Sequence, residues 1–215
     1  MKSAPLSTWT PGRLAETAEA LVAAGALPRI VQAGHPVLRT RALPFEGQFS
    51  GALLGELVDL MRRTMHAAPG VGLAAPQIGL PLQLAVLEDQ WPVDDEAAAA
   101  RDRSPLAFTA MLNPSWHAEG AGTARFYEGC LSVRGYTAVV ERASRVAARW
   151  TSPDGAARSA EFSGWQARIV QHETDHLAGA LYLDRAELRS LCANEVYTQR
   201  WAHPTPEQAA QELGF

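Results

Sequence analysis

The segment 171–176 (QHETDH) carries the residues with the clearest chemical potential in this chain. His172 and His176 are four positions apart, so on a helix both imidazoles project from one face. Two imidazoles on one face can bind a divalent metal, and the adjacent Glu173 can move protons to and from a water molecule. A helix that merely bears two surface histidines gives the same pattern, so a third ligand is needed to decide between the two interpretations.

A cysteine upstream offers that third ligand. In the segment 128–132 (EGCLS), the Cys130 thiolate is a soft ligand of the kind that transition metals accept. The helix that carries the histidines is also largely apolar, through Trp165, Ala167, Ile169, Val170 and Leu177. The histidines and acids of that helix are therefore expected to be buried, where they need partners, and a metal is one such partner.

A glycine-rich segment, residues 70–79 (GVGLAAPQIG), is the third stretch with chemical potential. Its glycines let the backbone approach a ligand closely, and Gln77 can donate its side-chain amide to a developing oxyanion. The alternative is a tight turn between a helix and a strand. The segment lacks the Gly-Lys-Ser/Thr ending of a phosphate-binding loop, which argues against a nucleotide site.

Together the three segments resemble the motifs of the peptide deformylase family, Gly-x-Gly-Leu-Ala-Ala-x-Gln, Glu-Gly-Cys-x-Ser and Gln-His-Glu-x-x-Asp-His-Leu. Residues 72–77, 128–132 and 171–177 match them in this order. The resemblance covers residues 28–186, which is most of the chain. It implies an α+β fold in which antiparallel sheets surround a central helix that carries the His-Glu-x-x-Asp-His motif.

The resemblance also implies the chemistry. It implies a mononuclear site, natively Fe(II), with Zn(II), Ni(II) or Co(II) possible in preparations, whose ligands are Cys130, His172 and His176. Water would take the open fourth position. The implied reaction is hydrolysis of N-formyl-methionyl peptides to formate and a free amino terminus. Glu173 would carry the proton, while the Gln77 amide and the backbone N–H of Leu131 would stabilise the oxyanion.

The substrate is expected to meet the glycine-rich segment. Its main chain would run along Val71 and Gly72 as an added strand. Val71 and Ile169 are candidate walls for the methionine pocket, and the alternative for each is an ordinary core position. Asp175 is expected beside the metal ligands rather than among them, in an ion pair with Arg142 that orients the helix.

At Arg134 the sequence departs from the family, which usually has proline there. The plain interpretation is a change in a solvent-facing loop, and the alternative is altered handling of substrates or inhibitors, as in an inhibitor-resistant second copy. Deformylation of a formylated metabolite is another possibility. A zinc endopeptidase is a rival, but its third ligand usually lies downstream, where His203 precedes Pro204. A non-catalytic binding protein with this fold is the remaining rival.

Composition narrows the class of protein. The chain has 215 residues, of which 47% are hydrophobic, and a net charge of −4, which predicts one globular domain and no DNA-binding surface. No stretch is apolar and long enough to span a membrane, and acids interrupt the N-terminal apolar run, so a cytoplasmic protein is expected. Cys130 and Cys192 do not form a disulfide framework, and Cys192 is interpreted as a core residue of a helix.

Periodicity and turn residues predict the elements that position these motifs. Helices are predicted from Thr10-Pro11 to Gly25, over 51–66, from Ser163-Gly164 through the histidines, and over 188–201. Strands are predicted over 81–88, 106–113, 136–150 and 158–163, with a surface insertion and helical turn over 94–103. Residues 1–27 are expected to form an N-terminal helical extension of the single domain 1–215. Residues 187–215 form a C-terminal helix and tail that is a candidate ribosome contact.

Overall fold

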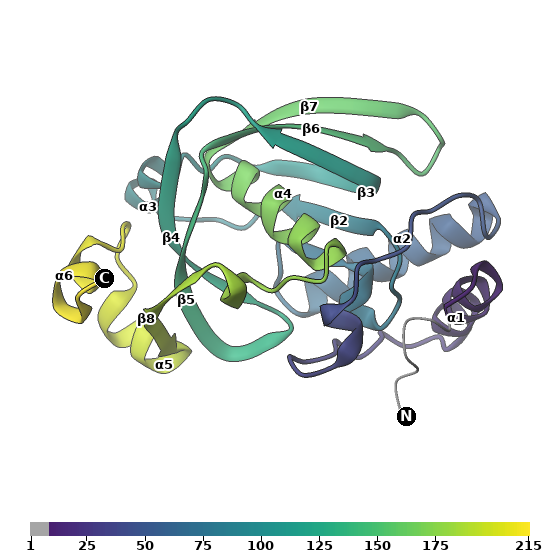
Figure 1. The fold of residues 1–215 in the computed structure, drawn as a ribbon, viewed down its shortest axis with the longest axis horizontal. Helices are drawn as coiled ribbons and strands as arrows, with labels where there is room; N and C mark the ends of the chain where they lie inside the picture. Colours follow the sequence, from purple (N-terminus) through teal and green to yellow (C-terminus); the bar gives the residue numbers. More distant parts are fainter. Residues whose placement is uncertain (1–8) are drawn as a thin grey trace.

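The computed structural model describes residues 9–215, which form two antiparallel sheets with one helix between them (Figure 1). The larger sheet has the order β1 (Gly72–Ala74), β2 (Leu84–Asp89), β3 (Leu106–Ala118), β6 (Arg145–Thr151) and β7 (Ala157–Ser163). The smaller sheet has the order β4 (Thr123–Cys130), β5 (Val133–Ala143) and β8 (Ala186–Ala193). The prediction of an α+β fold with antiparallel sheets is confirmed.

The helix between the sheets is α4 (Gly164–Leu177), which carries both histidines. Its start at Gly164 agrees with the predicted start. One side of α4 buries Ala167, Val170 and Leu177 against the five-stranded sheet. Gly179 ends the helical region with φ 79°, and an added Cβ would lie 2.8 Å from the carbonyl carbon of Thr40, so the chain can turn tightly there only with glycine.

Two further helices cover the larger sheet on its other side. α2 (Gly51–Ala67) begins where the Ser50 hydroxyl accepts the N–H of Leu53, at 3.2 Å. Its apolar stripe packs on β1 and β2 in the core. α1 (Pro11–Ala23) packs on α2 and buries Leu14 and Ala18 completely. The described part of the N-terminal extension is thus joined to the core.

The predicted helix over 188–201 is wrong in its first half. Residues 186–193 instead form β8, which pairs with β5 on the edge of the smaller sheet. Leu188 and Leu191 suggested a helical stripe, but their side chains are 64% and 41% exposed, so they make no buried face. The ladder is irregular here, and the Ser190 hydroxyl accepts the N–H of Val139 at 2.7 Å. Pairing with β5 thus overrides the local helical pattern.

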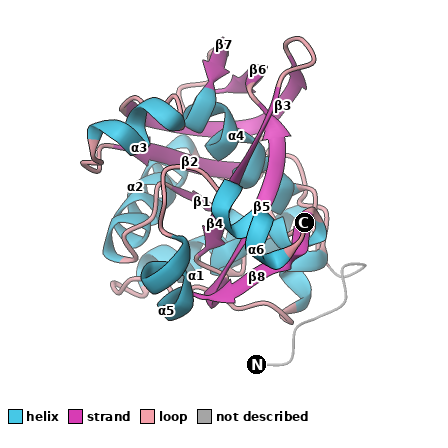
Figure 2. Cartoon of the chain, turned by 90° about the vertical axis from the view of Figure 1, so that its left-hand side faces the viewer, coloured by secondary structure: helices cyan, strands magenta, loops and turns pink. Residues whose placement is uncertain are grey.

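The chain after β8 folds back over the smaller sheet as α5 (Asn194–Val196), a π-helical turn (Tyr197–Trp201) and α6 (Glu207–Leu213). In Figure 2 these elements face the viewer beside β5 and β8. They bury Trp201 and Ala209 against Tyr127 and Val139. Cys192 lies at the edge of this cluster in a strand, so its predicted place in a helix is wrong, and both cysteines are free thiols.

The remaining elements are short or were predicted only in part. The surface insertion contains α3 (Asp95–Ala100), and three 3₁₀ helices span Pro36–Arg39, Ala75–Ile78 and Tyr182–Asp184. β4 was not predicted as a strand, and the single strand predicted over 136–150 is two strands, β5 and β6, that belong to different sheets. In the described residues, no helix combines the length and the apolar character needed to cross a membrane.

Candidate active site

Three side chains of types that can bind a metal meet between α4 and the end of β4. α4 contributes His172 and His176, whose rings lie 5.1 Å apart between centroids, and β4 contributes Cys130 at its last position. One ligand atom from each of the three lies within 4.8 Å of the others, and the Cys130 Sγ is 3.3 Å from Nε2 of His176. The structure thus brings together the three ligands that the sequence suggested.

These three donors fit a divalent transition metal. One sulfur and two imidazole nitrogens are a donor set that zinc and iron accept, and three protein ligands leave a further position for water or substrate. His176 is 1% exposed, and burial holds its pKa well below the ordinary value. Its ring is therefore neutral, which is the form that binds a metal.

Glu173 lies beside the ligands and is buried without a full set of partners. Its Oε2 has no hydrogen-bond partner among residues 9–215. Burial, which disfavours the charged form, raises the pKa of Glu173 to about 7, although His172 and Arg142 oppose this effect. Gly72 allows this position, because an added Cβ there would lie 2.2 Å from Oε1 of Glu173. The carboxyl group can therefore both accept and release a proton near neutral pH.

The Gln77 side chain is fixed on the other side of the cluster. Its Oε1 accepts the backbone N–H of Ala74 at 2.8 Å, which assigns the opposite end of the amide as the donor. The Nε2 group donates to the Ser132 hydroxyl at 3.2 Å and lies 3.7 Å from the Cys130 sulfur. Leu131 lines the same cleft between Cys130 and Ser132. The amide is thus oriented toward the candidate metal site.

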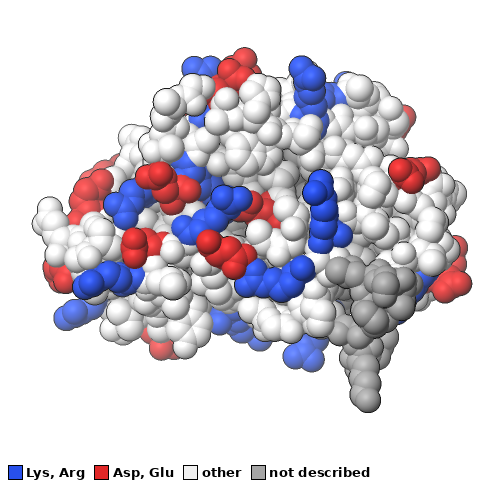
Figure 3. Space-filling view, viewed as in Figure 1, with Lys and Arg blue, Asp and Glu red and all other residues white. Residues whose placement is uncertain are grey.

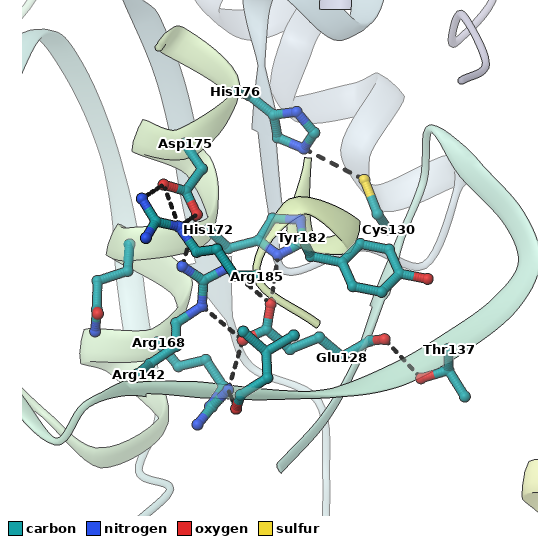
Figure 4. A network of polar contacts seen from close by, with 12 residues as sticks. Glu128, Cys130, Thr137, Arg142, Arg168, His172, Asp175, His176, Tyr182 and Arg185 are labelled. Carbon is teal, nitrogen blue, oxygen red and sulfur yellow. Dashed lines mark hydrogen bonds and ion pairs between the residues drawn. The ribbon is translucent and has the colours of Figure 1, made fainter. Parts of the chain in front are cut away.

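A buried ionic network supports the ligands from behind (Figure 4). Glu128 accepts two hydrogen bonds from Arg142, at 2.7 and 2.9 Å, and one from Arg168, and it contacts the Nδ1 atom of His172 at 2.9 Å. Burial opposes ionisation of Glu128, but the hydrogen bonds from His172 and Arg142 outweigh it and hold its pKa far below the usual range. The contact with Nδ1 orients the His172 ring so that Nε2 is free for a metal.

Asp175 belongs to the same network but not to the cluster of metal-binding atoms. Arg142 Nη1 donates to its carboxylate at 2.7 Å, and Arg185 adds a contact at 3.1 Å. Burial lowers the pKa of Arg142, yet Glu128 and Asp175 reverse this, and the net pKa is raised. The Arg142 side chain is 3% exposed, so it is not a solvent-facing residue.

Two of the candidate ligands, Cys130 and His172, line a cleft of about 330 Å³ together with Glu173. Val71, Gly72 and Ile169, the three predicted substrate contacts, all line it. The lining also includes residues that sequence reasoning did not assign to the site: Trp165, Arg168 and Asn194. Arg134 does not line the cleft; it is exposed, and its backbone N–H donates to the Gln32 side chain at 3.2 Å.

Simple spacing could have found several of these missed residues. Glu128 is two positions before Cys130 on β4, and its carboxylate contacts His172 of the same cluster. Arg168 is four positions before His172, and Trp165 four before Ile169, so each shares a face of α4 with a predicted site residue. Ser132 and Asn194 carry no such signal, because their places depend on contacts between distant segments.

Comparison with known proteins gives a consistent answer. The model of the family "Polypeptide deformylase" matches residues 27–191. Peptide deformylase 3 of Streptomyces avermitilis is 55% identical over 202 residues, which is 94% of this chain and 90% of that protein. Peptide deformylase 1 of Streptomyces coelicolor is also 55% identical, over 94% of this chain and 93% of its own length.

Solved structures agree with the sequence relatives. The crystal structure of the class I type b peptide deformylase of Acinetobacter baumannii with bound Met-Ala-Ser superposes with a TM-score of 0.67 at 30% identity. The alignment covers 74% of this chain and 98% of that one. The structure of peptide deformylase from Thermotoga maritima has a TM-score of 0.62 at 32% identity, over 75% of this chain and 99% of the other.

Proposed function

The chain belongs to the polypeptide deformylase family and removes the formyl group of newly made peptides; we propose that Glu173 carries the proton in this reaction. It is a metal-dependent hydrolase that acts on a linear amide. The observation that supports the role of Glu173 is its buried carboxyl group, which has a free Oε2 atom and lies beside the cluster of metal-binding side chains.

Cys130, His172 and His176 would hold the metal, for which Fe(II) is our proposal. When bound, the metal supplies a Lewis acid that makes water acidic enough to attack at neutral pH. A thiolate among the ligands makes the site softer than one built from histidine alone, and an iron form is expected to lose activity in air while a nickel form keeps it.

Side chains and backbone groups of the protein carry out the remaining steps. Glu173 accepts the proton of the attacking water and later delivers it to the departing nitrogen. The amide of Gln77 and the backbone N–H of Leu131 donate to the oxygen that becomes negative after attack. The C–N bond then breaks to give formate and a free amino terminus. The pKa of about 7 for Glu173 suits a group that must take and return one proton per turnover.

Formate release from formyl-Met-Ala-Ser by protein loaded anaerobically with Fe(II) tests this assignment. Glu173→Gln keeps the shape of the side chain but cannot accept the proton, so turnover should fall by about a thousand-fold or more while the metal content stays at one ion per chain. Glu161→Gln on the exposed end of β7 is the matched control and should behave as wild type. Unchanged turnover of the Glu173→Gln protein would refute the role.

Alternative reactions have distinct products. A zinc endopeptidase would cleave casein without releasing formate, and its usual downstream ligand is not supplied here, because the cluster consists of Cys130, His172 and His176. An enzyme specialised for a formylated metabolite, or an inhibitor-resistant second copy, would differ in its substrate or hydroxamate affinity. The exposed Arg134 outside the cleft favours the plain interpretation of the missing proline.

We propose that the protein works in the cytoplasm and that residues 187–215 are a candidate ribosome contact. On the face seen in Figure 3, positive and negative side chains are interspersed, without an extended basic area, and DNA binding is not expected. Salt-dependent co-sedimentation of the full chain with ribosomes would support the contact.

A further inference from the structure

The segment after β8 brings one side chain into the active-site cleft. Asn194 lines the cleft together with Gly129 and Leu131, which flank the candidate metal ligand Cys130. It does so although it lies beyond residues 27–191, the part of the chain that matches the family model. The C-terminal segment is thus part of the cleft wall.

Sheet pairing and packing hold Asn194 at this place. Gly129 pairs with Thr137 across the β4–β5 ladder, and Thr137 pairs with Cys192 across the β5–β8 ladder. Asn194 follows Cys192 by two positions. The segment after it is fixed by the ring of Tyr197, which lies 5.0 Å from that of Tyr127 on β4. The same strand that carries the ligand therefore determines the position of the asparagine.

The Asn194 carboxamide is available for binding. The residue is exposed at the rim of the cleft, and within residues 9–215 its side chain makes no hydrogen bond. Its backbone carbonyl is already used, by the hydroxyl of Thr198 at 2.9 Å. A carboxamide offers both acceptor lone pairs and N–H donors. Since an extended chain can present the N–H and the C=O of one residue on the same edge, one carboxamide can pair with both.

The position of the rim restricts which part of a substrate can reach Asn194. The formyl carbon must lie by Cys130 and the buried Glu173, and an apolar side chain is better placed against Trp165 and Ile169. A polar, exposed side chain at the rim suits the solvated main chain that leaves the cleft. Val71 and Gly72, which line the same cleft, offer backbone for the same chain to pair with.

We propose that Asn194 binds the main chain of the substrate on the carboxyl side of the formyl-methionine, and so determines the preference of the enzyme for peptides over single formylated amino acids. This inference rests on the proposed function. It makes Asn194 a specificity-determining residue, because the contact adds binding energy only when a further residue follows the methionine.

The test compares formyl-Met-Ala-Ser with formyl-methionine amide, which ends where the proposed contact begins. In the metal-loaded enzyme, Asn194→Ala should lower the ratio of the two kcat/KM values about five-fold, through a higher KM for the tripeptide with kcat retained. Asn194→Asp, which loses both N–H donors, should shift the ratio in the same direction. Gln199→Ala, an exposed change in the same C-terminal segment, is the matched control and should keep the wild-type ratio.

The outcomes distinguish a failure of this inference from a failure of the proposed function. An unchanged ratio in both Asn194 variants, or an equal loss on both substrates, would overturn the inference and leave deformylation intact. Failure of the wild-type protein to release formate from either substrate would overturn the proposed function and this inference with it. A lower ratio for Gln199→Ala would also overturn it, because the effect would then belong to the segment rather than to the carboxamide.

Discussion

Two glutamates of this protein have nearly the same partners in very different surroundings. Glu128 accepts a bidentate arginine, Arg142, and contacts a histidine, His172. Glu88 on β2 accepts a bidentate arginine of α2, Arg62, at 2.8 and 2.6 Å, and contacts a histidine of α2 at 2.8 Å. The side chains of the first pair are 4% and 3% exposed, but Arg62 is 41% exposed.

The difference shows that burial, not the pattern of contacts, decides what such a cluster does. Water and salt screen the pair at Glu88, so its contribution to stability is small. The charges of Glu128, Arg142 and Arg168 are almost entirely removed from water, so each depends on the others, and removing one leaves its partners poorly compensated. The buried cluster also reaches His172, a candidate metal ligand, whereas Glu88 does not line the cleft. Only the buried cluster is therefore expected to affect the metal.

Glu128→Gln should give the largest effect. It leaves Arg168 buried without a carboxylate and leaves Arg142 with Asp175 alone. This loss costs about 3 kcal/mol or more and should lower Tm by about 8 °C. It also removes the anion that orients the His172 ring, so metal affinity should fall about 10- to 100-fold. Thermal unfolding and Co(II) titration against a chelator measure the two effects. Equal losses in Glu88→Gln would abolish the proposed difference between the clusters.

Arg168→Met should give an intermediate effect. Arg168 donates to Glu128 and to the carbonyl of Val140, and its guanidinium lies 5.3 Å from the Phe126 ring centroid. Glu128 keeps Arg142, so the loss should be about 2 kcal/mol, with less than a ten-fold change in metal affinity. The same thermal and Co(II) measurements apply. A loss as large as that of Glu128→Gln would mean that Arg168, rather than Arg142, is the essential partner.

Glu88→Gln should give a small effect on stability and none on the metal. The Tm should fall by no more than about 3 °C, and this difference should shrink in concentrated salt because the pair is accessible to ions. Metal content and formate release should match those of wild type. A change in metal affinity would show that the α2–β2 cluster reaches the cleft through the backbone of Val71, whose carbonyl accepts the N–H of Glu88 at 3.0 Å.

The sequence predicted the parts of the site that depend on residues close together in the chain. The spacing of His172 and His176 placed both on one helix face, and the Gly-Cys-Leu-Ser segment supplied the third donor. The capped amphipathic helices α1 and α2 were found for the same reason. Local patterns cannot show that β8 pairs with β5 where Leu188 and Leu191 suggest a helix, because the outcome depends on a strand about 50 residues away. Asn194 reaches the cleft because β8 pairs with β5, so the sequence did not predict its place in the site.

The smallest expected effect is the pH dependence of the Tm difference between wild type and Glu88→Gln. The hydrogen bond from Arg62 lowers the pKa of Glu88 from the ordinary value of 4.5. Partial burial opposes this lowering, and the contact with His66 strengthens it. A lowered pKa in the folded state means that the stabilisation is complete above the unfolded pKa and is lost as the pH falls through the folded one. The Tm difference between wild type and Glu88→Gln should therefore shrink below about pH 4. Thermal unfolding of both proteins from about pH 5 to about pH 3, without added metal, gives the difference directly. A Tm difference that grows as the pH falls through this range would contradict the sign of the shift and remove the ion pair from the account of this cluster.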